Sequence, residues 1–148
     1  MNTNTSIQLA SPMSARPLPT RSEQIERVAT VVGRALVALL FILAGVVKIL
    51  NPTPFLEHMT RFGVPTWLLP AVIALELGAG IAILIGWRVR DAAGALSIFC
   101  ILTAALFHYQ LSISAERTLF LKDLAIAGGL LVMAASAATR ARMRARTG

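Results

Sequence analysis

Four long apolar runs, separated by short polar segments, dominate the chain. They cover residues 28–50, 66–86, 92–109 and 119–139. Each run is long enough to cross the hydrocarbon core of a bilayer as an α-helix, which takes about 20 residues. Backbone groups in lipid must be satisfied within their own segment, and none of the runs alternates with the period of two that a β-barrel needs. The pattern therefore predicts an all-α, polytopic membrane protein built as a four-transmembrane-helix bundle.

A short amphipathic segment separates the first two runs. Within residues 51–65, Phe55, Met59 and Phe62 recur at helical spacing and so share one face. Gly63 follows and can end a helix. We expect a short helix here that lies in the membrane interface.

The two ends of the chain are polar. Residues 1–27 are rich in Ser, Thr, Asn and Pro, which predicts a flexible N-terminal tail. Residues 28–139 then form the transmembrane domain, and residues 140–148 a basic C-terminal tail. The first apolar run is much longer than the roughly 7–15 residues of a signal-peptide core, so we expect it to be retained as a span.

The basic residues predict the orientation of the bundle. The positive-inside rule places the side richer in Lys and Arg, with both termini and the turn at residues 87–91, in the cytoplasm. We therefore expect a multi-pass protein of the bacterial inner membrane with cytoplasmic termini. Ten basic residues fall on the predicted cytoplasmic side, namely Arg16, Arg21, Arg27, Arg34, Arg88, Arg90, Arg140, Arg142, Arg144 and Arg146, and four on the other, namely Lys48, Arg61, Arg117 and Lys122.

Composition narrows the classes of function. With 56% hydrophobic and 14% charged residues, the chain is far more apolar than a soluble domain, which carries about 25% charged residues. The net charge of +7 follows from the topology rule, so the expected partner is the lipid bilayer and not nucleic acid. The single cysteine, Cys100, excludes an intrachain disulfide and is expected to pack as a small hydrophobe. His58 and His108 are the only histidines, too few for a convincing ligand set, so we predict no metal site.

Glu76 is the most informative residue, because it is the only charge in residues 67–86. At the middle of a span it would lie about 15 Å from either membrane surface. An ionised carboxylate at that depth costs about 2.5 kcal/mol or more, so it must face protein or water. Two interpretations stay open: a structural ion pair with Arg34, Lys48 or Lys122, or a functional group that handles protons.

Other polar residues lie near the ends of the remaining runs. In the predicted orientation five of them lie in the outer third of the membrane, above Glu76, and indicate a polar pocket that opens toward the outer leaflet. These five are Lys48, His108, Tyr109, Lys122 and Asp123. Arg34 lies about 21 Å from Lys48 along the first span and therefore belongs to the other leaflet. Glu76 and His108 are the candidate catalytic residues. The alternative is that the lysines extend to the headgroups and the His108–Tyr109 pair belongs to the interfacial belt. The candidates for ligand binding or charge pairing are Arg34, Lys48, Tyr109, Lys122 and Asp123.

Small residues suggest where helices approach one another. Ala74, Gly78 and Ala82 form a row with a spacing of four on the second span, and Ala125 and Gly129 do the same on the fourth. Rows of this kind allow close packing of membrane helices. We expect helix contacts along both rows.

An ordered series of short motifs resembles the DoxX family of membrane proteins over residues 34–133, about two thirds of the chain. The resemblance implies a four-helix inner-membrane protein. It is carried by RALVALLFILAGVVKIL from Arg34, NP at 51–52, FGVP at 62–65, ELGAG from Glu76, FH at 107–108 and FLKDLAIAGG from Phe120.

The resemblance also implies a class of function. The family includes a quinone-reducing thiosulfate oxidoreductase subunit and components of membrane-associated oxidative-stress complexes. We therefore expect a subunit or accessory of a membrane redox system that binds a quinone-like carrier near Glu76, with Glu76 and His108 delivering protons and a redox protein partner supplying electrons. The alternative is a non-enzymatic scaffold or assembly partner, in which buried charges specify helix pairing, including pairing in a homo-oligomer.

Overall fold

The computed structural model describes residues 20–107 and 113–147, and this part of the chain is helical and contains no strand. Four stretches are long and apolar enough to cross a membrane, which confirms the predicted all-α fold with four spans. In chain order the elements are α1 (Arg21–Leu50), α2 (Thr53–Arg61), the 3₁₀ helix η1 (Thr66–Leu68), α3 (Leu69–Ile85), α4 (Val89–Phe107) and α5 (Ser114–Thr147).

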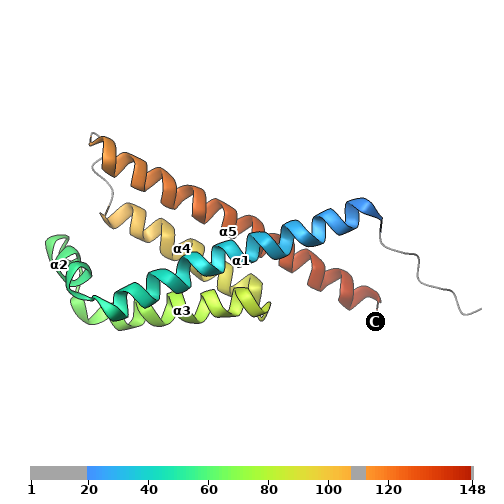
Figure 1. Cartoon of the computed structure of the whole chain (residues 1–148), viewed down its shortest axis with the longest axis horizontal. Helices are drawn as coiled ribbons and strands as arrows, with labels where there is room; N and C mark the ends of the chain where they lie inside the picture. Colours follow the sequence, from blue (N-terminus) through green and yellow to red (C-terminus); the bar gives the residue numbers. More distant parts are fainter. Residues whose placement is uncertain (1–19, 108–112, 148) are drawn as a thin grey trace, which may run out of the picture.

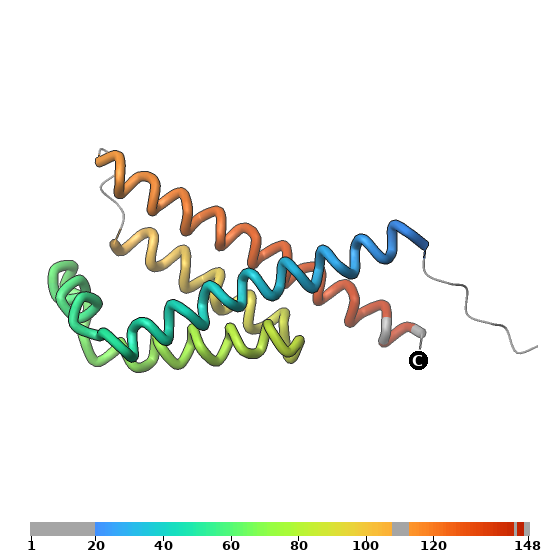
Figure 2. Tube along the Cα trace, in the orientation of Figure 1, coloured from blue at the N-terminus to red at the C-terminus, as the bar shows by residue number. Residues whose placement is uncertain are grey.

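The four long helices form two antiparallel pairs (Figure 1). α1 packs along α3, and α4 packs along α5, while α3 and α4 share a smaller contact beside the turn that joins them. From that turn the two pairs diverge toward the opposite end, where α2 lies across the end of α1 and the start of α3 (Figure 2). We refer to these two ends as the turn end and the α2 end.

Helix α1 begins at Arg21, seven residues before the predicted span. Thr20 explains the early start, because its Oγ1 accepts a hydrogen bond from the Glu23 amide while the Thr20 amide donates to the Glu23 carboxylate, a capping box. Residues 21–27, expected in the flexible tail, are therefore helical, and residues 1–19 lie outside the described residues. Apolar patterning locates the part of a helix that crosses lipid, whereas caps decide where the helix itself begins.

Helices α4 and α5 also extend past their predicted bounds. α4 begins at Val89 instead of residue 92, and α5 begins at Ser114 instead of residue 119. α5 continues to Thr147, so most of the predicted basic tail is part of the same helix. The alternating Arg and Ala residues of that tail favour a helix once the preceding turns have nucleated it.

The two pairs share one apolar core near the turn end. Small side chains alternate with large ones across the contact, which lets the helices pack closely there. Cys100 is 6% exposed and packs as the small hydrophobe expected from the sequence. The buried members are Ala38, Phe41, Ala79, Ile83, Ala93, Leu96, Cys100, Ala127 and Leu130.

Two glycines set the close approach of α1 and α3. A Cβ added at Gly45 would lie 2.7 Å from the Leu77 side chain, and one at Gly80 would meet α1 at 3.0–3.4 Å. The predicted contact rows are mostly wrong by comparison, because a Cβ at Gly78 or Gly129 would meet nothing within 4 Å, although Ala82 at the end of the first row is buried. The spacing of four identified the right helix but the wrong face.

Exposed tryptophans mark the two ends of the α3 span. Trp67 and Trp87 are 74% and 64% exposed. They are twenty residues apart, roughly 30 Å along a helix, which matches the thickness of a hydrocarbon core. Because Trp concentrates at membrane–water interfaces, the two residues place the α2 end and the turn end at opposite headgroup layers.

Candidate functional site

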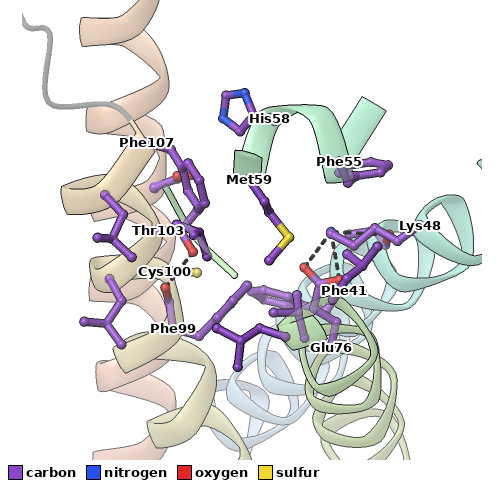
Figure 3. Close-up of a pocket in the computed structure, with 18 of the residues that line it drawn as sticks. Phe41, Lys48, Phe55, His58, Met59, Glu76, Phe99, Cys100, Thr103 and Phe107 are labelled. Atoms are coloured by element: carbon purple, nitrogen blue, oxygen red, sulfur yellow. Dashed lines mark hydrogen bonds and ion pairs between the residues drawn. The ribbon is translucent and has the colours of Figure 1, made fainter. Parts of the chain in front are cut away.

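The central feature of the α2 end is an ion pair between Lys48 and Glu76. The Lys48 Nζ donates to both Glu76 oxygens, Oε1 and Oε2, at 2.8 Å (Figure 3). Both side chains are sheltered, with 14% of Lys48 and 4% of Glu76 exposed. Lys48 lies in the last turn of α1 and Glu76 in the middle of α3, so the pair links these two helices. Of the three bases considered from the sequence, Lys48 is the one that the structure brings to Glu76.

The Lys48 ammonium has two further neighbours. It lies 4.9 Å from the centre of the Phe55 ring, which α2 places over it, and 3.5 Å from the carbonyl oxygen of Ala44. The aromatic face is electron-rich and attracts a cation, most strongly away from water. The short helix α2 therefore contributes directly to the environment of the ion pair.

The ion pair lies on the wall of a cavity of about 440 Å³ between the diverging helix pairs. Most of the wall is aliphatic or aromatic, with a few convergent polar groups, as in small-molecule sites, which measure roughly 300–1,000 Å³. The apolar wall includes Leu40, Phe41, Phe55, Met59, Leu69, Val72, Phe99, Cys100, Leu106, Phe107 and Ile126, and the polar groups are Lys48, His58, Glu76, Thr103, Lys122 and Asp123.

Three rings meet between α2 and the end of α4, and two of them, His58 and Phe107, line the cavity. The His58 ring centroid is 4.9 Å from those of Phe62 and Phe107, and the two phenylalanines are 5.4 Å apart, edge to face. This cluster joins α2 to the second helix pair across the open end. Met59, which is 7% exposed, points from α2 into the space between the pairs (Figure 3).

Lys122 and Asp123 lie on the α5 side of the same cavity. Their side chains form an ion pair at 3.3 Å, in which 55% of Lys122 but only 12% of Asp123 is exposed. Both residues line the cavity, the Lys122 side chain at its exposed edge and the Asp123 carboxylate in a more sheltered position. Lys122 is thus paired, but with its neighbour Asp123 and not with Glu76, the partner considered from the sequence.

Arg34 lies away from this site, at the turn end. Its Nε and Nη2 both donate to the Ile83 carbonyl oxygen, at 3.0 and 2.7 Å, and Nη2 also donates to Leu84 at 3.1 Å. These carbonyls lie in the last turn of α3, where helix carbonyls lack the usual amide donors, and the Ile83 oxygen also accepts from the Gly86 amide at 3.2 Å. Arg34 is about 21 Å from Lys48 along α1 and pairs with a helix C-terminus, not with Glu76.

The remaining candidates, His108 and Tyr109, lie outside the described residues. The residue before them, Phe107, lines the cavity. Within residues 20–107 and 113–147 no three His, Cys, Asp or Glu side chains come together in a way that could hold a metal ion.

Sequence reasoning missed several residues of the cavity wall. Phe55 was assigned only to an interfacial helix, His58 was considered only as a metal ligand, and Thr103 was not considered. His58 and Phe62 are four residues apart, a spacing that puts two rings side by side on a helix and could have indicated the cluster. Thr103 gives no such signal, because its hydroxyl donates to the Phe99 carbonyl of its own helix at 2.8 Å.

Comparison with known proteins decides the family. The profile of the DoxX family matches residues 29–109, more than half of the chain. This chain belongs to the DoxX family. The match covers the ion pair, α2 and the α3–α4 turn.

Two relatives extend the comparison. The inner membrane protein YqjF of Escherichia coli (strain K12) is 40% identical over 112 residues, which cover 76% of this chain and 86% of the relative. The inner membrane protein YphA of the same organism is 28% identical over 110 residues, 70% of this chain and 79% of the relative. No solved structure matches the chain. The chain is thus a DoxX-family inner membrane protein with four spans.

Proposed function

We propose that this DoxX-family protein binds a lipid-soluble, quinone-like carrier in the cavity at the α2 end, as a subunit or accessory of a membrane redox or oxidative-stress system. The observation that supports the proposal is the cavity itself, about 440 Å³ of mostly apolar space with the Lys48–Glu76 pair on its wall. An aromatic head with polar oxygens and an apolar tail matches that combination of surfaces.

The wall offers contacts for each part of such a carrier. Phe41, Phe55 and Phe99 provide aromatic surface for a flat ring. A carbonyl oxygen of the ring would accept a hydrogen bond from an ammonium, either Lys48 or Lys122. Lys48 already donates to Glu76, so a carrier bound at Lys48 would share the hydrogen-bond donors of this ammonium with the carboxylate.

Reduction of a quinone to a quinol takes up two electrons and two protons. Glu76 and the predicted partner His108 are the groups proposed to relay protons to the two ring oxygens. The electrons would come from a redox protein partner, since amino-acid side chains of this kind carry none.

Filling the cavity tests the proposal. Thr103→Phe would place a ring in the cavity, whereas Ala105→Phe places the same ring at an exposed position of α4 outside the wall. We expect purified wild-type protein and Ala105→Phe to bind a short-chain ubiquinone, measured by quenching of tryptophan fluorescence, and Thr103→Phe to lose at least tenfold in affinity, about 1.4 kcal/mol. Undetectable binding by the wild type, or equal binding by both variants, would refute the proposal.

The ion pair also supports a second candidate, a non-enzymatic scaffold. Both Glu76 oxygens are occupied by Lys48, an arrangement suited to fixing the register of α1 against α3. A scaffold predicts that Glu76→Gln lowers cellular abundance or changes the proteins that co-purify, while Thr103→Phe changes neither. If Thr103→Phe alone abolishes a redox phenotype at normal abundance, the carrier-binding function is favoured.

We further propose that both termini lie in the cytoplasm, so that the cavity opens toward the outer leaflet. Support comes from the arginines of the turn end, against few basic residues at the α2 end. Fusions of alkaline phosphatase and of green fluorescent protein to the C-terminus test this, because the first is active only outside and the second fluoresces only inside. An active phosphatase fusion would reverse the assignment.

A further inference from the structure

A second hollow, of about 330 Å³, lies at the turn end, at the opposite membrane face from the carrier cavity. Arginines from three separate segments line it: α1, the turn into α4 with its first residues, and α5. Its wall consists of Arg34, Gly86, Arg88, Val89, Arg90, Ala137, Arg140 and Ala141.

Most of this positive charge is not neutralised by the protein. Arg88 pairs with Asp91, with 2.7 Å between Nη2 and Oδ2. Arg34 donates hydrogen bonds from Nε and Nη2 to the carbonyl oxygens at the end of α3. No carboxylate is recorded within ion-pair distance of Arg90 or Arg140 among the described residues, and both side chains are exposed. The hollow therefore presents four guanidinium groups with one carboxylate beside them.

The helices around the hollow extend to different heights. α3 and α4 stop at the turn, while α1 extends thirteen residues before Arg34 and α5 continues seven residues past Arg140. The hollow lies in the angle between the short hairpin and the two longer helices. Trp87, 64% exposed in the turn, marks this level as the membrane interface. The phosphate groups present at that level in a membrane are those of phospholipids.

We propose that the hollow is a binding site for the phosphate of an anionic membrane phospholipid. Guanidinium groups bind phosphate oxygens through two parallel hydrogen bonds, and Arg90 of α4 and Arg140 of α5 would each bind in this way. The N-terminus of the 19-residue helix α4 adds the positive end of its dipole. Basic pockets between transmembrane helices are suited to such headgroups.

The surface below the hollow accommodates the rest of the lipid. Leu84 and Ile85, the last residues of α3, are 50% and 69% exposed. An acyl chain whose headgroup occupies the hollow would run along these side chains into the bilayer. A free phosphate ion would make the guanidinium contacts but gain nothing from this apolar surface, which is why we assign the site to a lipid. The inference is independent of what occupies the carrier cavity.

A matched pair of double variants tests the site. Arg90→Gln with Arg140→Gln removes two charges from the hollow, and Arg27→Gln with Arg142→Gln removes two exposed charges of α1 and α5 outside it. Arg34 is left unchanged because it holds the end of α3. The full chain, purified in detergent, is titrated with dioleoyl-phosphatidylglycerol or the zwitterionic dioleoyl-phosphatidylcholine, and bound lipid is counted by native mass spectrometry.

We expect phosphatidylglycerol to bind the wild type and the control variant with the same affinity, within about twofold, and more tightly than phosphatidylcholine. The hollow variant should bind it about 25-fold more weakly, or about fivefold for each arginine. Inorganic phosphate at lipid-matched concentrations should not compete.

Three results would overturn the inference. Equal loss in both double variants would mean diffuse attraction to surface charge. Equal affinity for the two lipids would mean that the site does not distinguish an anionic headgroup from a zwitterionic one. Competition by inorganic phosphate would assign the hollow to a free anion. Circular dichroism of each variant checks that the helices are intact, and Arg140→Gln alone, expected to lose about fivefold, gives an independent measure if the double variant is unstable.

Discussion

Breaking the Lys48–Glu76 pair one residue at a time should cost far more stability than replacing both residues. The changes are Lys48→Met and Glu76→Gln, alone and together, each close to the original side chain in size. At 2.8 Å and an effective dielectric constant of about 20, the gross attraction is about 6 kcal/mol. Desolvation of two charges that are 14% and 4% exposed offsets most of it.

The magnitude for each variant follows from this balance. Each single change leaves the other charged group without its partner in a sheltered place, which costs about 3–5 kcal/mol in the free energy of unfolding. The double change removes both desolvation costs, so it should lie within about 1–2 kcal/mol of the wild type. The coupling free energy between the two positions, the sum of the single effects minus the double effect, is then at least about 4 kcal/mol.

Unfolding in mixed micelles, titrated with sodium dodecyl sulfate and followed by circular dichroism, measures these differences. Lys122→Met is the control, because the Lys122 ammonium is 55% exposed and its pair with Asp123 should contribute about 1 kcal/mol or less. The reasoning is refuted if both single variants lie within about 0.5 kcal/mol of the wild type, or if their effects simply add up in the double variant.

Three further changes test other contacts of the bundle by the same unfolding measurement. Gly86→Ala should lower stability by about 1–2 kcal/mol or more, because φ is +83° there and an added Cβ would lie 2.7 Å from Arg34 Nη2; an unchanged midpoint would contradict the assigned turn. Arg34→Lys should cost about 1–3 kcal/mol, since a single ammonium cannot reproduce the fork that binds the Ile83 carbonyl, and full rescue by Lys would show that charge alone suffices. Ser97→Ala should cost about 0.6–1.7 kcal/mol, because the fully buried Ser97 hydroxyl donates to the Ala127 carbonyl of α5 at 3.0 Å, and a stabilised variant would mean that this bond contributes nothing.

The sequence predicted the spans well because the signal that defines them is summed over some twenty residues. Glu76 stood out for the same reason, as one charge against a long apolar background. The sequence did not show how each helix is rotated about its own axis, and therefore which of its faces meets a neighbouring helix. Gly78 and Gly80 lie two residues apart on α3, yet an added Cβ meets α1 only at Gly80. Periodicity on one helix does not say which of its faces meets a neighbour.

In the site, too, the depth of a residue along its own helix could be predicted from the sequence, whereas contacts between helices could not. Lys48, Glu76, Lys122 and Asp123 were selected by depth alone, and the structure places all four on one cavity. Arg34 lies at the opposite end, as its distance of about 21 Å from Lys48 along α1 predicted, and the structure adds its contact with the end of α3. Phe55 could be placed over the Lys48 ammonium only from coordinates, since the path of the loop between α1 and α2 sets that contact.

The divergence of the two helix pairs gives the molecule a wedge-shaped outline (Figure 1). A wedge displaces more lipid from one leaflet than from the other, so the lateral pressure of the wider leaflet acts on the gap between the pairs. Lipids with small headgroups, which press harder on the acyl-chain region, would push the pairs together around the hinge at the α3–α4 turn. We therefore expect the width of the cavity to depend on the surrounding bilayer as well as on the contacts within the chain.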